Sequence, residues 1–66
     1  MKTSNLAARL RRRLRQLGMK PSELAAAAYV RRSNISRYLA GTHRPTHGAV
    51  IQRLARALQV STSWFD

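Results

Sequence analysis

The 66-residue sequence contains no cysteine, which excludes disulfide bonds, thiolate chemistry and cysteine-based zinc sites. A chain this small must therefore be held together by its hydrophobic core or by association. Long apolar runs are also missing, because the longest, residues 24–30, is mostly alanine and falls far short of the roughly 20 residues that a membrane-spanning helix needs. Residues 1–5 lead into arginines, where a secretory signal would need an apolar stretch of about 7–15 residues. We expect no membrane-spanning segment and no export.

Acidic residues are equally scarce, since only Glu23 and Asp66 carry carboxylate side chains. Acid–base or nucleophilic catalysis needs paired groups with tuned pKa values, and the sequence offers no such pair and no triad. His43 and His47 have the spacing that would direct two side chains of a helix toward one metal ion, but Pro45 between them argues against a continuous helix. We therefore expect no enzyme, no metal site, no cofactor and no small-molecule ligand.

Positive charge dominates what is present. The chain has 13 lysines and arginines against two acidic residues, which gives a formal net charge of +11 at pH 7. So large an excess has almost no partners within the chain and predicts a polyanionic partner. Hydrophobic residues make up 44% of the sequence, which is enough to form a core and unlike a disordered basic tail. The length predicts one domain over residues 1–66.

Apolar residues recur with a helical period in the first two thirds of the chain. The first predicted helix starts at a Thr3 or Ser4 cap, ends at Gly18 and carries a stripe of Leu6, Leu10, Leu14 and Leu17. A short helix over about 21–28 begins at Pro21, which suits the first helical position. Another helix over about 32–40 ends at Gly41.

The last third of the chain predicts one long helix and one short one. Thr46 is the predicted cap of a fourth helix, whose inner face carries Val50, Ile51, Leu54, Ala57 and Leu58. Ser61 is the predicted cap of a short fifth helix that carries Trp64 and Phe65, and we expect both aromatic rings to be mostly covered. The sequence thus predicts a compact all-α fold of four to five helices.

The predicted third helix has a polar outer face. If Ala25 lies where this helix crosses the second one, Ile35 faces inward, and the outer residues are Arg31, Arg32, Ser33, Asn34, Ser36 and Arg37. An α-helix fits the major groove of DNA, where arginine recognises guanine and asparagine or serine can bond to other base edges. Two arginines at the start of a helix cost about 0.3–1 kcal/mol each, so helix stability does not explain them. Base contact is our hypothesis, and a solvated polar face is the alternative.

One pattern covers nearly the whole chain: Pro21-Ser22-Glu23-Leu24-Ala25, Val30, Asn34-Ile35-Ser36-Arg37, Gly41 and Pro45, continuing through residues 54–61 and Trp64. This pattern resembles the lambdoid phage repressor and Cro, or XRE-type, helix-turn-helix family. The resemblance implies a repressor-like fold with residues 32–40 as the recognition helix. It implies that Arg32, Ser33 and Arg37 face the bases, with Asn34 and Ser36 nearby. It also implies a homodimer on a pseudo-palindromic operator.

The chain departs from the family pattern in and around the turn. Tyr29 stands where the family usually has glycine, and a left-handed non-glycine residue costs about 1–2 kcal/mol. Arg31 replaces the usual serine or threonine cap, which makes Ser33 an alternative cap and allows a later helix start. The family often pairs an arginine of the first helix with a glutamate of the third. Both positions are leucine here, and we expect Leu14 and Leu39 to touch.

Phosphate contacts form a second predicted layer around the recognition helix. Pro21 replaces a polar residue that commonly binds phosphate in the family, so this contact passes to a neighbouring residue. The candidates lie in loops and helix starts and comprise Lys20, Ser22, Arg31, Thr42, His43, Arg44 and Thr46. For each of them, a merely exposed polar residue is the alternative.

The leading interpretation is a sequence-specific transcriptional regulator, a repressor, that binds double-stranded DNA. We expect it in the cytoplasm of a bacterium, bacterial or phage-encoded, and associated with the nucleoid. One alternative is an antitoxin-like module of the same fold that binds an acidic protein. The basic amphipathic segment 6–15 would suit a membrane surface if its leucines were exposed, and the arginine cluster would also suit RNA.

Overall fold

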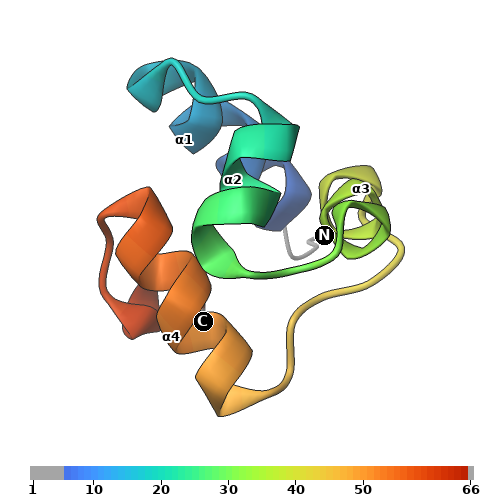
Figure 1. Ribbon diagram of the computed structural model, residues 1–66, viewed down its shortest axis with the longest axis vertical. Coiled ribbons are helices and arrows are strands. Elements are labelled where there is room, and N and C mark those ends of the chain that lie inside the picture. Colours follow the sequence, from blue (N-terminus) through green and yellow to red (C-terminus); the bar gives the residue numbers. More distant parts are fainter. Residues whose placement is uncertain (1–5, 66) are drawn as a thin grey trace, which may run out of the picture.

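The computed structural model describes residues 6–65, which form an all-α fold as predicted. Its helices are α1 (Leu6–Leu17), α2 (Pro21–Ala28), α3 (Arg32–Ala40) and α4 (Gly48–Leu58), and a short 3-10 helix η1 (Thr62–Phe65) follows them. Figure 1 shows α2 in the middle, with α3 on one side and α4 on the other, while α1 passes behind α2. The predicted fifth helix is therefore a single 3-10 turn.

The starts of the helices confirm some predicted caps and correct others. Pro21 begins α2 and Arg32 begins α3, as predicted. Arg31 is the cap residue of α3, and its carbonyl accepts the N–H groups of Asn34 and Ile35, so the alternative cap at Ser33 is wrong. Thr46 is also not the cap of α4. That position belongs to His47, because the backbone is still extended there (φ −75°, ψ 126°) and the helix begins only at Gly48. Thr3 and Ser4 lie outside the described residues.

All four α-helices end in the same way. At each end one residue adopts the left-handed conformation: Gly18 (φ 64°), Tyr29 (φ 57°), Gly41 (φ 83°) and Gln59 (φ 59°). The N–H of the following residue bonds back to a carbonyl of the last turn, as from Met19 to Leu14 at 2.9 Å and from Val30 to Ala25 at 3.0 Å. The ends predicted at Gly18 and Gly41 are confirmed. Tyr29 keeps the geometry of the glycine that it replaces.

The core is built from the predicted apolar faces. The most deeply buried side chains come from all four helices and η1; they are Leu6, Leu10, Leu14, Leu24, Ala25, Ala28, Ile35, Leu54, Ala55, Leu58 and Phe65. Trp64 is half-buried and meets Phe65 edge-on at 5.0 Å between ring centroids, so the predicted cover of both rings is confirmed. Because the leucines of α1 lie in this core, they are not exposed to meet a membrane surface.

Arginines hold the ends of the helices. Arg13 donates from Nε to the carbonyl of Leu58, at 2.9 Å, and Arg53 donates from Nε to the carbonyl of Ala28, at 3.0 Å. Arg11 donates from Nη1 to the carbonyl of Leu39 near the end of α3. The last carbonyls of a helix have no partner within it and form the negative end of its dipole. Backbone carbonyls therefore take the place of carboxylates as the partners of these arginines, and the bonds connect one helix to another.

The turn at Tyr29 yields a first prediction. Tyr29→Gly removes the left-handed strain and should stabilise the protein by about 0.5–1 kcal/mol, after allowing for the greater freedom of glycine in the unfolded chain. Urea denaturation measures the change. Gln59→Gly should act in the same direction because the geometry at the end of α4 is the same. Tyr29→Ala keeps the strain and should not stabilise; if it does, loss of the exposed ring and not relief of strain is the cause.

The arginine contacts yield a second prediction. Arg13→Met should destabilise the protein by about 1–2 kcal/mol, because it leaves carbonyls at the end of α4 without a donor. Arg12→Met removes the same charge from an exposed neighbouring position and should change stability by less than about 0.5 kcal/mol. Thermal and urea unfolding of the two variants give the comparison. Equal losses would contradict a specific role of the Arg13 contacts.

Candidate nucleic-acid interface

The helices α2 and α3 meet across a three-residue connection, 29–31, and pack against each other. Tyr29 reverses the chain through its left-handed conformation, and Arg31 then enters α3 in an extended conformation. Ala25 is only 4% exposed, which agrees with the predicted close approach of the two helices. Figure 1 shows α3 nearly end-on beside the upright α2, so the two helices cross at a steep angle.

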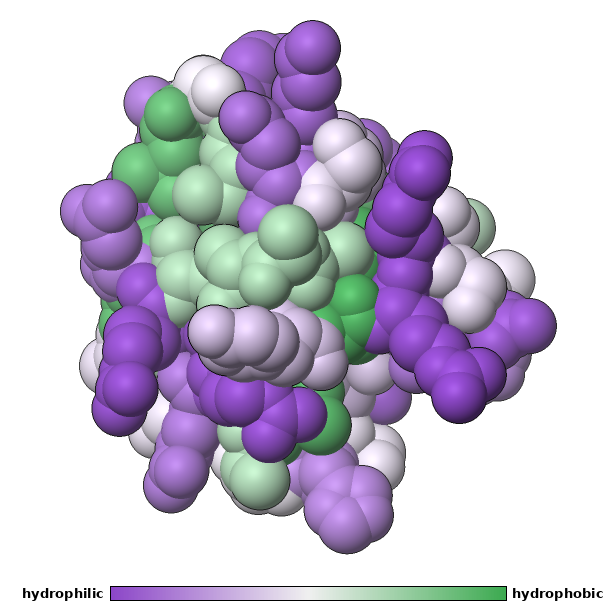
Figure 2. Space-filling model, in the orientation of Figure 1, coloured by the Kyte–Doolittle hydropathy of each residue, from purple (hydrophilic) through white to green (hydrophobic). Residues whose placement is uncertain are grey.

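The outer face of α3 is polar and open. Ile35 is 1% exposed and anchors the inner face. Four of the predicted base-contacting residues are exposed and share the outer face at helical spacing: Arg32, Ser33, Ser36 and Arg37. Figure 2 shows strongly hydrophilic side chains projecting from the surface over α3. The face presents hydrogen-bond donors of two kinds, charged guanidinium groups and hydroxyls.

Asn34 differs from the other base-contact candidates. It is half-buried at the side of α3, and its Oδ1 accepts a hydrogen bond from Nη1 of Arg37 at 3.4 Å.

The first turn of α3 contains no acidic residue that could offset the arginines at its start. The positive charge of these arginines is therefore not compensated within the first turn, at the end of the helix where the dipole disfavours cations.

The phosphate candidates lie at three places in the chain: the start of α2, the start of α3 and the loop that follows α3. Lys20 and Ser22 are exposed at the start of α2, where the N–H of Lys20 donates to Oε1 of Glu23 at 2.7 Å. The remaining candidates belong to the α3 cap and the following loop and are also exposed: Arg31, Thr42, His43, Arg44 and Thr46. All of the predicted phosphate-contacting residues are thus at the surface of the molecule.

Comparison with known families gives this arrangement a name. A family model described as "Helix-turn-helix" matches residues 10–65, which includes all four α-helices apart from the start of α1. The chain belongs to this helix-turn-helix family. The match confirms the resemblance to XRE-type domains that the sequence shows, and it supports a DNA-binding regulator. Among the curated proteins and the solved structures, none matches the chain.

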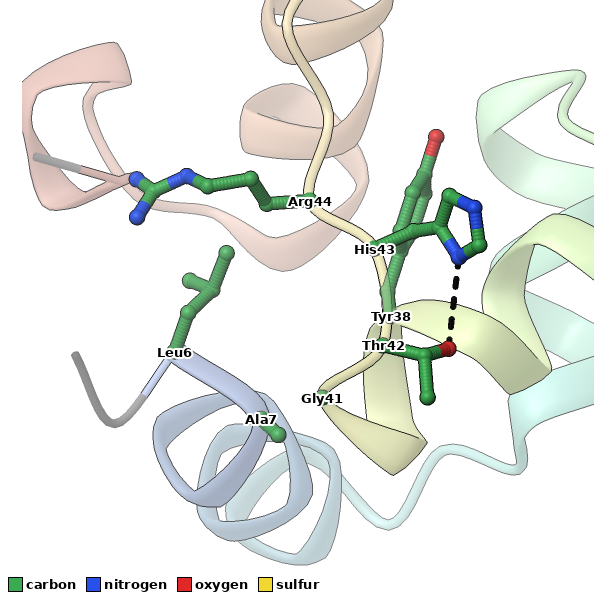
Figure 3. Close-up of a pocket in the computed structure, with 7 residues that line it drawn as sticks. All are labelled: Leu6, Ala7, Tyr38, Gly41, Thr42, His43 and Arg44. Carbon is green, nitrogen blue, oxygen red and sulfur yellow. Dashed lines mark hydrogen bonds between the residues drawn. The ribbon is translucent and has the colours of Figure 1, made fainter. Parts of the chain in front are cut away.

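The loop after α3 of this helix-turn-helix domain is held at both ends. The hydroxyl of Thr42 donates to the carbonyl of Arg37 at 3.3 Å, and Nδ1 of His43 lies 3.2 Å from the same hydroxyl oxygen. Arg44 extends in the opposite direction from His43, as Figure 3 shows, and donates from Nη2 to the carbonyl of Phe65 at 2.7 Å. Sequence patterns could not reveal this bond, because every residue has a backbone carbonyl and the acceptor is therefore not marked by its residue type.

An apolar pocket of about 350 Å³ lies between α1, α2 and α3 on the helix-turn-helix domain. Leu14 and Leu39 both line it, together with Met19 and Pro21. The two leucines that replace the family's charged pair are thus brought to one place. Replacing both partners of an ion pair by apolar groups avoids the cost of a lone buried charge.

Other kinds of site find little support in the part of the chain that the structure describes. Residues 6–65 contain no group of three or more side chains that could hold a metal ion. His43 and His47 lie on different elements, one in the loop and the other at the cap of α4. No helix in the same range has the length and apolar character that crossing a bilayer requires.

Proposed function

We propose that this chain is a sequence-specific regulator that binds double-stranded DNA with α3 in the major groove. The observation that carries the proposal is the polar face of α3, which stands free on a helix whose opposite side is fixed in the core by Ile35. An exposed helix of this kind fits the width of the major groove. In this proposal residues 1–66 form a single DNA-binding domain without enzymatic activity.

Base recognition falls to the open face of α3. Arg32 and Arg37 can each offer paired donors to O6 and N7 of a guanine, while Ser33 and Ser36 can bond to other base edges. Asn34 can contact a base from the side of the helix, but in the free protein its amide oxygen serves Arg37. Among these residues Arg37 is the most specific candidate for a base contact, because its bond to Asn34 limits the orientations of its side chain.

Phosphate contacts should fix the helix in the groove. Lys20 and Ser22 would bind from the start of α2, Arg31 from the start of α3, and Thr42, His43 and Thr46 from the loop that follows α3. Arg44 remains a candidate, although its bond to Phe65 gives it a structural role as well. The formal charge of +11 supports this layer, because each phosphate neutralised by a cation releases counterions from DNA.

Regulation follows from occupancy in this proposal. A homodimer would bind a pseudo-palindromic operator, with one recognition helix in each half-site, and would repress by excluding the transcription machinery. The high positive charge opposes association of two copies in free solution, whereas DNA phosphates between them would offset the repulsion. The protein would act in the cytoplasm on the bacterial nucleoid, encoded by a bacterium or a phage. Selection of bound duplexes from a random pool tests the proposal through the half-site sequence and spacing.

Arg37→Ala gives the most specific test of base recognition. We expect a loss of about 1–3 kcal/mol at one base pair and relaxed preference there, because paired bonds to guanine are lost. Lys20→Ala is the matched control and should weaken selected and random duplexes alike, since it acts on phosphate. Fluorescence anisotropy with both kinds of duplex measures the difference. An equal loss for Arg37→Ala on selected and random DNA would remove α3 from base recognition.

Salt dependence tests the phosphate layer. If the bound protein neutralises roughly 6–10 phosphates, its affinity for DNA should fall by a factor of about 10³–10⁵ when the salt concentration rises from 50 to 200 mM. Competition with duplex and single-stranded RNA in the same assay separates DNA from RNA as the preferred partner, because the deep, narrow major groove of RNA does not admit the side chains of a helix. Stronger competition by RNA than by random DNA would overturn the proposal.

A further inference from the structure

The side chain of Tyr29, in the connection between α2 and α3, does not contribute to the core. Within residues 6–65 it is the one large hydrophobic side chain that is exposed, at 83%, and its hydroxyl makes no hydrogen bond to that part of the chain. Its backbone is left-handed (φ 57°), a conformation that is strained for tyrosine and unstrained for glycine. A disfavoured backbone conformation that carries an unburied aromatic ring indicates a role outside the fold.

Tyr29 is held close to the entrance of α3, in the connection that Figure 1 shows leading there from α2. Its N–H bonds to the carbonyl of Ala26 at 3.4 Å, and the N–H of Val30 bonds to the carbonyl of Ala25 at 3.0 Å, so the backbone here is fixed. Val30 is half-buried and packs against the core, which leaves Tyr29 and Arg31 exposed on either side of it. Two peptide units separate these residues, so their Cα atoms are at most about 7.6 Å apart. A group that binds Arg31 is therefore within reach of the Tyr29 side chain.

A DNA phosphate suits both of these residues. Tyrosine hydroxyls donate to phosphate oxygens in protein–DNA complexes, and such contacts position the protein on the duplex. The bases of a duplex are stacked on one another and offer no free face to a ring at the surface, whereas the bases of a single strand do. For a protein that binds duplex DNA, the hydroxyl is therefore the group of Tyr29 that can bond. Arg31 would neutralise the same phosphate or its neighbour on the strand.

We propose that Tyr29 is a DNA-contacting residue whose hydroxyl donates to a backbone phosphate at the edge of the groove that α3 enters. This inference rests on the proposed function and adds to it a contact from the turn between α2 and α3. The strain at Tyr29 is then a loss of stability that affinity for DNA offsets. Stability and DNA binding should consequently respond in opposite directions when glycine replaces this residue.

Tyr29→Phe tests the hydroxyl alone, because it keeps both the ring and the left-handed backbone. It should bind a duplex about threefold to tenfold more weakly than wild type, which is the net effect of about one hydrogen bond. The loss should be the same on selected and random duplexes, since a phosphate carries no sequence information. Fluorescence anisotropy measures the affinities, and thermal unfolding checks that the variant is folded.

Tyr29→Gly separates binding from stability. Relief of the strain should raise the midpoint of urea unfolding, while the affinity for DNA should fall at least as far as in Tyr29→Phe. Gln59→Gly is the matched control, because Gln59 has the same left-handed geometry (φ 59°) at the end of α4. It should gain stability and keep the wild-type affinity. A residue that acted only on the fold would move stability and affinity in the same direction.

The partner phosphate can be located on a selected duplex. Each phosphate in turn is replaced by an uncharged methylphosphonate, and the affinities of wild type and Tyr29→Phe are compared. At one position wild type should lose distinctly more affinity than the variant, because the variant has already lost that contact. Equal losses of the two proteins at every position would overturn the contact.

The outcomes separate this inference from the proposed function. If wild-type protein binds no duplex, the proposed function fails and this contact fails with it. If wild type binds and Tyr29→Phe keeps its full affinity, the function stands and the contact is overturned. A loss that appears only in Tyr29→Gly and is largest on single-stranded DNA would also overturn it, because the ring and not the hydroxyl would then be the binding group.

Discussion

Hydrogen bonds from arginine to the carbonyls at helix ends are the interaction on which this structure depends. A domain with 13 basic and two acidic residues cannot build a network of ion pairs. Arg11, Arg13 and Arg53 instead bond to carbonyls that the helices leave without a partner. Carbonyl groups satisfy the donors but do not neutralise the charge. The protein thereby gains contacts between helices and keeps the positive surface that a polyanion would bind.

The same solution explains how α3 can carry arginines where they weaken a helix. Its first turn has no acidic residue and its cap has no side-chain bond, so local interactions contribute little to its stability. Stability comes from Ile35 in the core, from the turn at Gly41 and from Arg11 at the far end of the helix. The cost at the surface of α3 is thus offset by contacts on its other sides. The exposed side chains of such a helix can vary without unfolding it.

The sequence predicted those features that depend on a residue type at a fixed place in the chain. Pro21 and Gly41 mark helix ends through their own backbone preferences, and the leucine spacing of α1 marks its buried face. The cap at Thr46 was wrong because the chain stays extended through His47, and a residue type with good capping preference does not by itself set where the extended segment ends. The partners of the arginines were equally hidden, since every residue has a carbonyl. Family resemblance, not periodicity, ranked the residues of α3 as base contacts.

The loop after α3 is also held by hydrogen bonds to backbone carbonyls, and it lies next to the candidate interface. Thr42 bonds to the end of α3, and two residues later Arg44 bonds to the end of η1, so the loop is fixed between the candidate interface and η1. His43 lies between these two anchors, with its Nδ1 3.2 Å from the hydroxyl oxygen of Thr42. A loop that is fixed at both ends before a ligand arrives loses less conformational entropy on binding than a free loop would. This matters in a small domain, which makes few contacts with its ligand.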